Sequence, residues 1–291
     1  AAFGGDGALV DVAAGVVADP VLVRLHTATG GSISYPTVAV VAGENAQASV
    51  VVDITSEDVD AVTVPLIQVA AGPASLVKLS IIQHLGPRLR QVGALRAAVD
   101  RDATLALAEA GLGGRLARLH LMVDLEGRGS SANVVGTYFG DEDQVMDYRY
   151  FMRHAGLDTR SDMFLKGAVE DRALSVFTGL IRIDEGAQRT DAYQTNRNLI
   201  LSEGAAAQSV PNLEILANDV KCGHGSSVGP LDEEQRYYLM SRGLDRSQAD
   251  RLQVRGFFEQ ALTRFPHPEV TDAVREWVNA KYVTAQAEGR V

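Results

Sequence analysis

The chain has 291 residues, enough for one large domain or two ordinary ones, and its 46% hydrophobic and 22% charged residues are typical of a folded globular protein. A formal net charge of -10 without a basic stripe argues against nucleic acid and anionic lipid surfaces as partners. The single cysteine, Cys222, excludes an intramolecular disulfide and fits a reducing, cytoplasmic location, and no window of the sequence predicts a membrane span.

From about residue 8 to residue 228, short strand-like runs alternate with Gly, Asp, Asn and Pro. The clearest run is residues 117–125, where apolar and polar side chains alternate with a period of two. The density of strands predicts a mainly β fold, but the pattern alone leaves a sandwich, a barrel and a β-helix open. No strict short repeat is visible, so a β-helix would have irregular coils. The other predicted strands are residues 37–42, 48–54, 62–69, 76–83, 133–139, 146–152, 174–183, 196–201 and 213–220.

Residues 89–114 are ambiguous between helix and strand. Their Ala and Leu content allows a helix that ends at the glycines of residues 111–114. The alternation around Leu105 and Leu107 favours a strand instead. We predict a strand after Asp102.

The pattern becomes helical after Pro230. We expect a helix over residues 232–242 with an acidic first turn, a second over 247–264 that begins with a capping box at Asp245 and Gln248, and a third over about 270–287. The sequence therefore predicts a β core domain, residues 1–229, and a C-terminal helical domain, residues 230–291.

The most informative local motif is Cys222-Gly223-His224. On an extended strand the thiol and the imidazole project to the same face, roughly 7 Å apart. Both are good ligands for soft and borderline metals, but a zinc site or an iron–sulfur cluster wants about four protein ligands. The pair therefore suggests half of a site that another chain completes. The alternatives are a small buried hydrophobe beside a hydrogen-bonded turn residue, or, less well supported, a cysteine nucleophile.

Five segments near the C-terminus together resemble the SufB/SufD family of the SUF iron–sulfur cluster assembly system. They are residues 190–199, 209–215, 218–225, 228–232 and 238–243. Similarity is weaker upstream, and before about residue 102 it is mostly a matter of pattern. Cys222-Gly223-His224-Gly225 resembles the SufD form of the family, since SufB-type chains tend to have a Glu-His-Glu-Ala type of sequence there.

The resemblance implies a right-handed parallel β-helix with a C-terminal α-helical tail. It also implies a non-catalytic scaffold that pairs with SufB through Lys221, Cys222 and His224, with a nascent Fe–S cluster shared at that interface and His224 as its ligand. The tail is expected to bind a SufC ATPase; no P-loop is present, so this chain should bind no nucleotide itself. The chain could also form a homodimer when isolated. The residues expected to contact SufC are Tyr237, Tyr238, Leu239, Arg242, Val254, Phe257 and Phe258.

Three other interpretations compete with this one. A SufB-like paralogue acting as the main cluster scaffold would be expected to need more than one cysteine. A carbohydrate-active β-helix enzyme would need clustered Asp residues with a basic partner, which the sequence does not show. A β-helical structural adaptor without metal ligation stays open. The family's usual N-terminal helical region has no counterpart, and the sequence begins without Met, so we expect a trimmed or partial chain.

Overall fold

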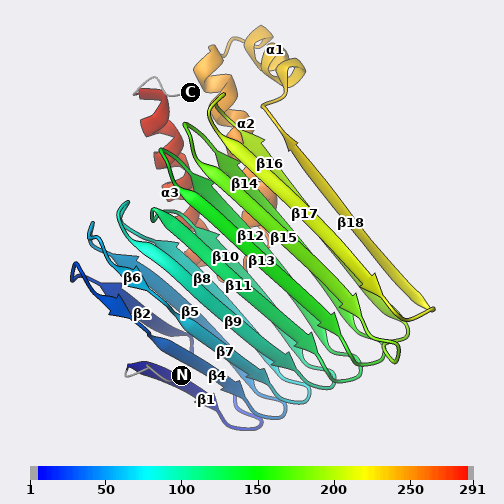
Figure 1. Ribbon diagram of the computed structural model, residues 1–291. Coiled ribbons are helices and arrows are strands. Elements are labelled where there is room, and N and C mark those ends of the chain that lie inside the picture. Colours follow the sequence, from blue (N-terminus) through cyan, green and yellow to red (C-terminus); the bar gives the residue numbers. More distant parts are fainter. Residues whose placement is uncertain (1–5, 288–291) are drawn as a thin grey trace.

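The computed structural model describes residues 6–287, which form a parallel β-solenoid of about eight turns followed by three helices (Figure 1). Apart from two short additional strands, the strands alternate along the chain between two sheets, so each coil adds one parallel strand to each sheet. This arrangement confirms the mainly β architecture and the solenoid expected from the family resemblance.

The two sheets face each other across a lumen. Sheet A runs in the order β1-β4-β7-β9-β11-β13-β15-β17, with the short strands β3 and β6 beside that path, and sheet B runs β2-β5-β8-β10-β12-β14-β16-β18. The strands of sheet A are β1 (Gly7–Val12), β3 (Ile33–Ser34), β4 (Thr37–Ala42), β6 (Val62–Thr63), β7 (Leu66–Ala71), β9 (Arg90–Val99), β11 (Leu116–Leu125), β13 (Val145–His154), β15 (Leu174–Ile183) and β17 (Ala206–Ile215). The strands of sheet B are β2 (Val21–Thr27), β5 (Gln47–Ser56), β8 (Leu76–His84), β10 (Thr104–Gly111), β12 (Ser131–Gly140), β14 (Arg160–Val169), β16 (Thr190–Ile200) and β18 (Val220–Gly229).

Alternating burial explains why these segments form strands. In β11 every second side chain is buried in the lumen and the others are half-buried on the outer face, as the period of two predicted. The lumen is filled mainly by Val, Leu, Ile and Ala, with a group of aromatic side chains, Tyr138, Tyr148, Tyr150 and Phe177, in its later coils. Burial of this apolar surface is the main stabilising contribution to the solenoid.

A ladder of left-handed residues forms the turns from sheet A to sheet B. From coil to coil these residues are Asn45, Ala74, Asp102, Gly129, Asp158 and Arg189, all with positive φ. The backbone N–H of each one donates to a carbonyl oxygen in the corresponding turn of the next coil, as from Asp102 to Arg128 at 2.9 Å. Aligned residues of adjacent coils are 26 to 32 positions apart, so the ladder satisfies the backbone groups of the turns while coil length varies.

Two strand predictions need correction. Residues 62–69 are split into β6 and β7 around Pro65, which has no backbone N–H to donate to a ladder. Residues 213–220 are not one strand, because Leu213 lies near the end of β17, Val220 begins β18 and a turn separates them.

Residues 89–114 contain β9 and β10, so the strand predicted after Asp102 is confirmed and a helix there is excluded.

The three predicted helices are confirmed as α1 (Glu233–Ser241), α2 (Arg246–Leu262) and α3 (Pro268–Ala287). The capping box at Asp245 and Gln248 is also present at the start of α2. Helices α2 and α3 cover the outer face of sheet B and share one hydrophobic cluster with strands β8, β10, β12 and β14. Within that cluster, the rings of Phe139 and Phe258 lie 6.2 Å apart.

Candidate functional site

Strand β18 ends sheet B. It pairs with β16 on one side, and within residues 6–287 no strand pairs with its other edge (Figure 1). Strand β17 ends sheet A in the same way. The last coil therefore presents unpaired backbone N–H and C=O groups on both sheets, a ready template for a further strand.

Cys222 and His224 lie on this terminal strand. They are in register with Ala192 and Gln194 of β16, whose side chains are buried in the lumen, so the thiol and the imidazole face the open end of the lumen. His224 is exposed, whereas Cys222 is half-buried against the core. Burial raises the pKa of the Cys222 thiol above its ordinary value, so metal ligation would have to release this proton.

The structure separates Lys221 from this pair. Lys221 is exposed and in register with Asp191, one position out of phase with Cys222, so it belongs to the outer face of sheet B. Gly223 also belongs to that face, where a Cβ atom would approach the Tyr193 ring at 3.3 Å. Lys221 can therefore contact a partner at the rim of the open end, but it does not join the donor pair.

The coil behind the pair has a polar interior that sequence reasoning missed. Gln194, Asn196 and Asn198 of β16 are buried in the lumen, at positions that are mostly apolar in earlier coils. The Asn198 amide donates to Asn196 Oδ1 at 2.8 Å. The sequence signal was available, because Gln-x-Asn-x-Asn places three amides on the inward face of a strand.

The helical residues that are expected to contact a partner differ in their exposure. Tyr237 and Tyr238 of α1 are 77% and 56% exposed, Arg242 lies over the Tyr238 ring, and Leu239 and Phe257 are half-buried. Val254 and Phe258 are buried in the cluster beneath α2. The prediction that these two side chains contact a partner needs correction, because the apolar face of α2 packs on sheet B.

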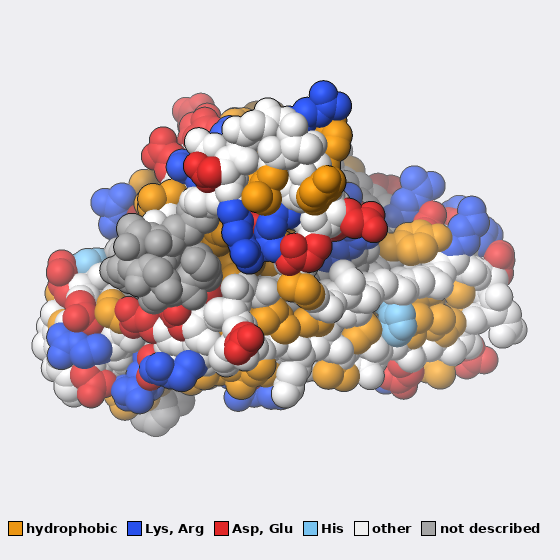
Figure 2. Space-filling view, turned by 90° about the horizontal axis from the view of Figure 1, so that it is seen from above, with side chains coloured by type: hydrophobic (Ala, Val, Ile, Leu, Met, Phe, Trp, Pro, Cys, Tyr) orange, Lys and Arg blue, Asp and Glu red, His pale blue; other side chains and the backbone are white. Residues whose placement is uncertain are grey.

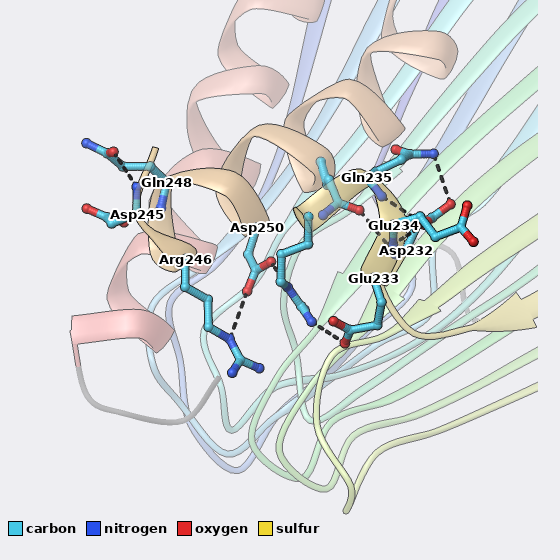
Figure 3. A network of polar contacts seen from close by, with 10 residues as sticks. Asp232, Glu233, Glu234, Gln235, Asp245, Arg246, Gln248 and Asp250 are labelled. Carbon is cyan, nitrogen blue, oxygen red and sulfur yellow. Dashed lines mark hydrogen bonds and ion pairs between the residues drawn. The ribbon is translucent and has the colours of Figure 1, made fainter. Parts of the chain in front are cut away.

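Helix α1 is attached to α2 by a polar network (Figure 3). Arg236 forms ion pairs with Glu233 and with Asp250 of α2, and both Arg236 and Asp250 have side chains only 12% exposed. Asp232 caps α1 by accepting from the backbone N–H groups of Glu234 and Gln235. The network positions the exposed tyrosines of α1 relative to the solenoid.

A groove of about 560 Å³ separates the C-terminal ends of β16 and β18 from α1 and α2. At its base Lys166 donates to Gln260 Oε1 at 2.7 Å and lies 4.1 Å from the centre of the Phe257 ring. Burial lowers the pKa of Lys166 to about 8. Seen from above, the helices rise over the solenoid, with hydrophobic, basic and acidic side chains close together (Figure 2).

Two features are absent from the described part of the chain. No group of three or more His, Cys, Asp or Glu residues there could hold a metal ion. No helix of residues 6–287 is long and apolar enough to cross a membrane.

These features define a class of protein: a β-solenoid whose last strand presents a thiol and an imidazole at an open edge, with a helical tail beside it. Residues 24–257 match the family model described as "SUF system FeS cluster assembly, SufBD core domain". The chain therefore belongs to the SufB/SufD core family, as the sequence resemblance indicated.

Several curated relatives agree with this assignment. The chain is 32% identical over 264 residues to an iron–sulfur cluster assembly SufBD family protein of Mycobacterium leprae, covering 88% of this chain and 67% of the relative. It is 40% identical over 189 residues to a SufBD family protein of Mycobacterium bovis, and the match covers 62% of this chain and 48% of the relative. It is 33% identical over 165 residues to the iron–sulfur cluster assembly protein SufD of Escherichia coli, and the match covers 57% of this chain and 37% of the relative. The matches thus span from about a third to two thirds of the relatives' own lengths.

Proposed function

We propose that this chain is a SufD-type scaffold subunit that pairs with SufB at its open edge, shares a nascent iron–sulfur cluster there and docks a SufC ATPase on its helices. On this proposal the chain is not itself catalytic and binds no nucleotide. We place the complex in the cytoplasm, where a reducing environment keeps a thiol such as Cys222 available.

The observation that carries the proposal is the position of the donor pair. Cys222 and His224 lie on the strand whose free edge is open for pairing, and His224 is exposed rather than sealed in the body. A SufB strand added to this edge would cover both side chains and satisfy the unpaired backbone groups. The same contact would bring further ligands to a site that has only two of the roughly four that a cluster requires.

The test of ligation uses the chain co-expressed with SufB and SufC homologues from the same source. His224→Ala should lower the iron and sulfide content of the purified complex several-fold while the three subunits still co-purify. His26→Ala is the matched control, because His26 is another exposed histidine on an edge strand, β2, at the opposite end of the solenoid. Unchanged cluster content in His224→Ala would leave only an adaptor role.

Docking of SufC is supported by the exposed aromatic surface of α1. Tyr and Arg side chains contribute disproportionately to protein–protein contacts, and Tyr237, Tyr238 and Arg242 form such a group. The double variant Tyr237→Ala/Tyr238→Ala should weaken SufC binding about tenfold or more, as measured by titration calorimetry. Leu22→Ala, which removes an exposed side chain on β2, should leave the affinity unchanged. Equal affinities for all three proteins would place the SufC contact elsewhere.

A further inference from the structure

Gln194 is buried at a position where its amide lacks hydrogen bonds within the described part of the chain, which lowers the stability of the fold. Its side chain is 1% exposed in the lumen, and neither its Nε2 nor its Oε1 has a hydrogen-bond partner among the described residues. A buried amide without partners destabilises a fold, so each such group calls for an explanation.

The inward-facing row of side chains that contains Gln194 changes from apolar to polar near the open end. Earlier members of this inward-facing row are apolar and fully packed, Gln194 is the first polar member, and the next and last member is His224. From β5 to β18 the row consists of Val50, Leu79, Leu107, Val134, Met163, Gln194 and His224.

Gly179 on the opposite sheet makes room for this glutamine. A Cβ atom at position 179 would lie only 2.3 Å from Nε2 and 2.4 Å from Oε1 of Gln194. The side chain of Gln194 therefore reaches across the lumen to the backbone of β15. Any other residue at position 179 would force the amide out of this place.

Neighbouring polar atoms extend the same feature. Asn196 Nδ2 and Ser209 Oγ, from β16 and β17, are also buried without partners in the described structure. Asn196 is in register with Ser226 of the terminal strand β18, and Ser209 lies on β17, the terminal strand of sheet A. The floor of the open end is thus rich in unused hydrogen-bonding groups.

We propose that the side-chain amide N–H of Gln194 donates a hydrogen bond to sulfide of the nascent cluster held by Cys222 and His224. This inference rests on the proposed function and extends it to the inner wall of the site. Sulfide carries negative charge, and hydrogen bonds to cluster sulfur stabilise it and tune its reduction potential. The space beside Gly179 accommodates the amide, which has no hydrogen-bond partner among the described residues of this chain.

The test compares two properties of Gln194→Leu. In the isolated chain the variant should be as stable to heat as the wild type or more stable, because an unpaired amide is replaced by an apolar group. In the co-expressed complex its cluster should lose iron to a chelator roughly tenfold faster, and its reduction potential should shift to a more negative value. A merely structural role would not raise stability and lower cluster retention together.

Gln91→Leu is the matched control. Gln91 is another buried glutamine of the lumen, and its Oε1 also has no partner among the described residues, but it lies on β9, far along the solenoid from β18. The same change there should leave the rate of iron loss unaltered. If both variants accelerate iron loss equally, the effect is a general one on the fold and the inference is overturned.

A second comparison tests the packing alone. Gly179→Ala should lower the melting temperature of the isolated chain, and Gln194→Ala should restore most of that loss, because the shorter side chain removes the clash. Equal destabilisation in both backgrounds would overturn the role given to Gly179.

The outcomes separate the inference from the function on which it rests. Loss of cluster in His224→Ala with wild-type behaviour in Gln194→Leu overturns the inference and leaves the proposed function standing. Normal cluster content in His224→Ala overturns both. Loss in both variants, with Gln91→Leu unaffected, supports both.

Discussion

Glu109 is a carboxyl group fully enclosed in the lumen of the solenoid. It lies on β10 and accepts a hydrogen bond from the Tyr150 hydroxyl at 3.2 Å. Burial raises the pKa of Glu109 from its ordinary 4.5 to about 8, so the side chain is protonated in the folded protein at neutral pH. The unfolded chain releases this proton near pH 4.5. Stability therefore falls as the pH rises from about 4.5 to about 8, because the folded state binds the extra proton across that window.

Glu109→Gln should remove this pH dependence, since a neutral amide can still accept from Tyr150. We expect the variant to be more stable than the wild type by a few kcal/mol at pH 8, with a much smaller difference at pH 5. Urea unfolding at the two pH values measures the change. Glu203→Gln alters an exposed carboxyl and should have little effect at either pH. An equal gain for Glu109→Gln at both pH values would contradict the assignment of a neutral carboxyl.

At the scale of elements, the attachment of α1 depends on few contacts. None of the nine residues of α1 is buried, so its position is set by its cap, by the ion pair of Arg236 with Asp250, and by a hydrogen bond from the Asp232 backbone N–H to Gln253 Oε1 of α2. Removing one partner of a largely buried pair leaves the other charge without compensation. The helix that carries the exposed tyrosines is thus tied to α2 through one ion pair and one hydrogen bond.

Arg236→Ala should therefore release α1 while the solenoid stays folded. Amide hydrogen exchange within α1 should become about tenfold faster or more, and SufC binding should weaken with it. Arg246→Ala is the control, because Arg246 is 72% exposed and reaches the same Asp250 only at 3.9 Å. An exposed pair of this kind contributes little, so exchange in α1 should be almost unchanged. Equal exchange rates in both variants would show that the ion pair of Arg236 with Asp250 does not hold the helix.

At the scale of the whole molecule, the open end is the feature that asks for a partner. Strands β17 and β18 present free edges together, and natural proteins normally protect such edges with charge, a bulge or a covering segment. We expect the isolated chain to self-associate through this end at micromolar concentration, with SufB taking that place in the complex.

Lysine at the inward positions of β18 should prevent this association. Ser226→Lys/Val228→Lys puts two charges on exposed positions of the open end and should shift the isolated chain to the monomer in sedimentation experiments. Val41→Lys, on β4 in the interior of sheet A, should leave the distribution unchanged. A monomeric wild-type chain would contradict self-association through the edge.

Much of the local structure could be predicted from the residues alone. The period of two in residues 117–125 and the capping box at Asp245 are short-range signals, and the structure confirms both. Strand β14 was missed because the covering helix α2 buries its outer face as well, which removes the alternation in its second half. Val254 and Phe258 were assigned to a contact surface for a related reason. Helical periodicity identifies an apolar face, but it does not say whether this chain or another one covers that face.

For the candidate site, the sequence by itself determined the donor types, their spacing and their common face, because side-chain chemistry and strand geometry are local properties. It did not determine that Cys222 and His224 stand on the last strand, nor that Gln194 lies behind His224 with Gly179 opposite. Those relations join residues about fifteen to thirty positions apart, through coil lengths that vary from turn to turn. Only the stacking of the coils sets that register, and with it the open edge on which the proposed function depends.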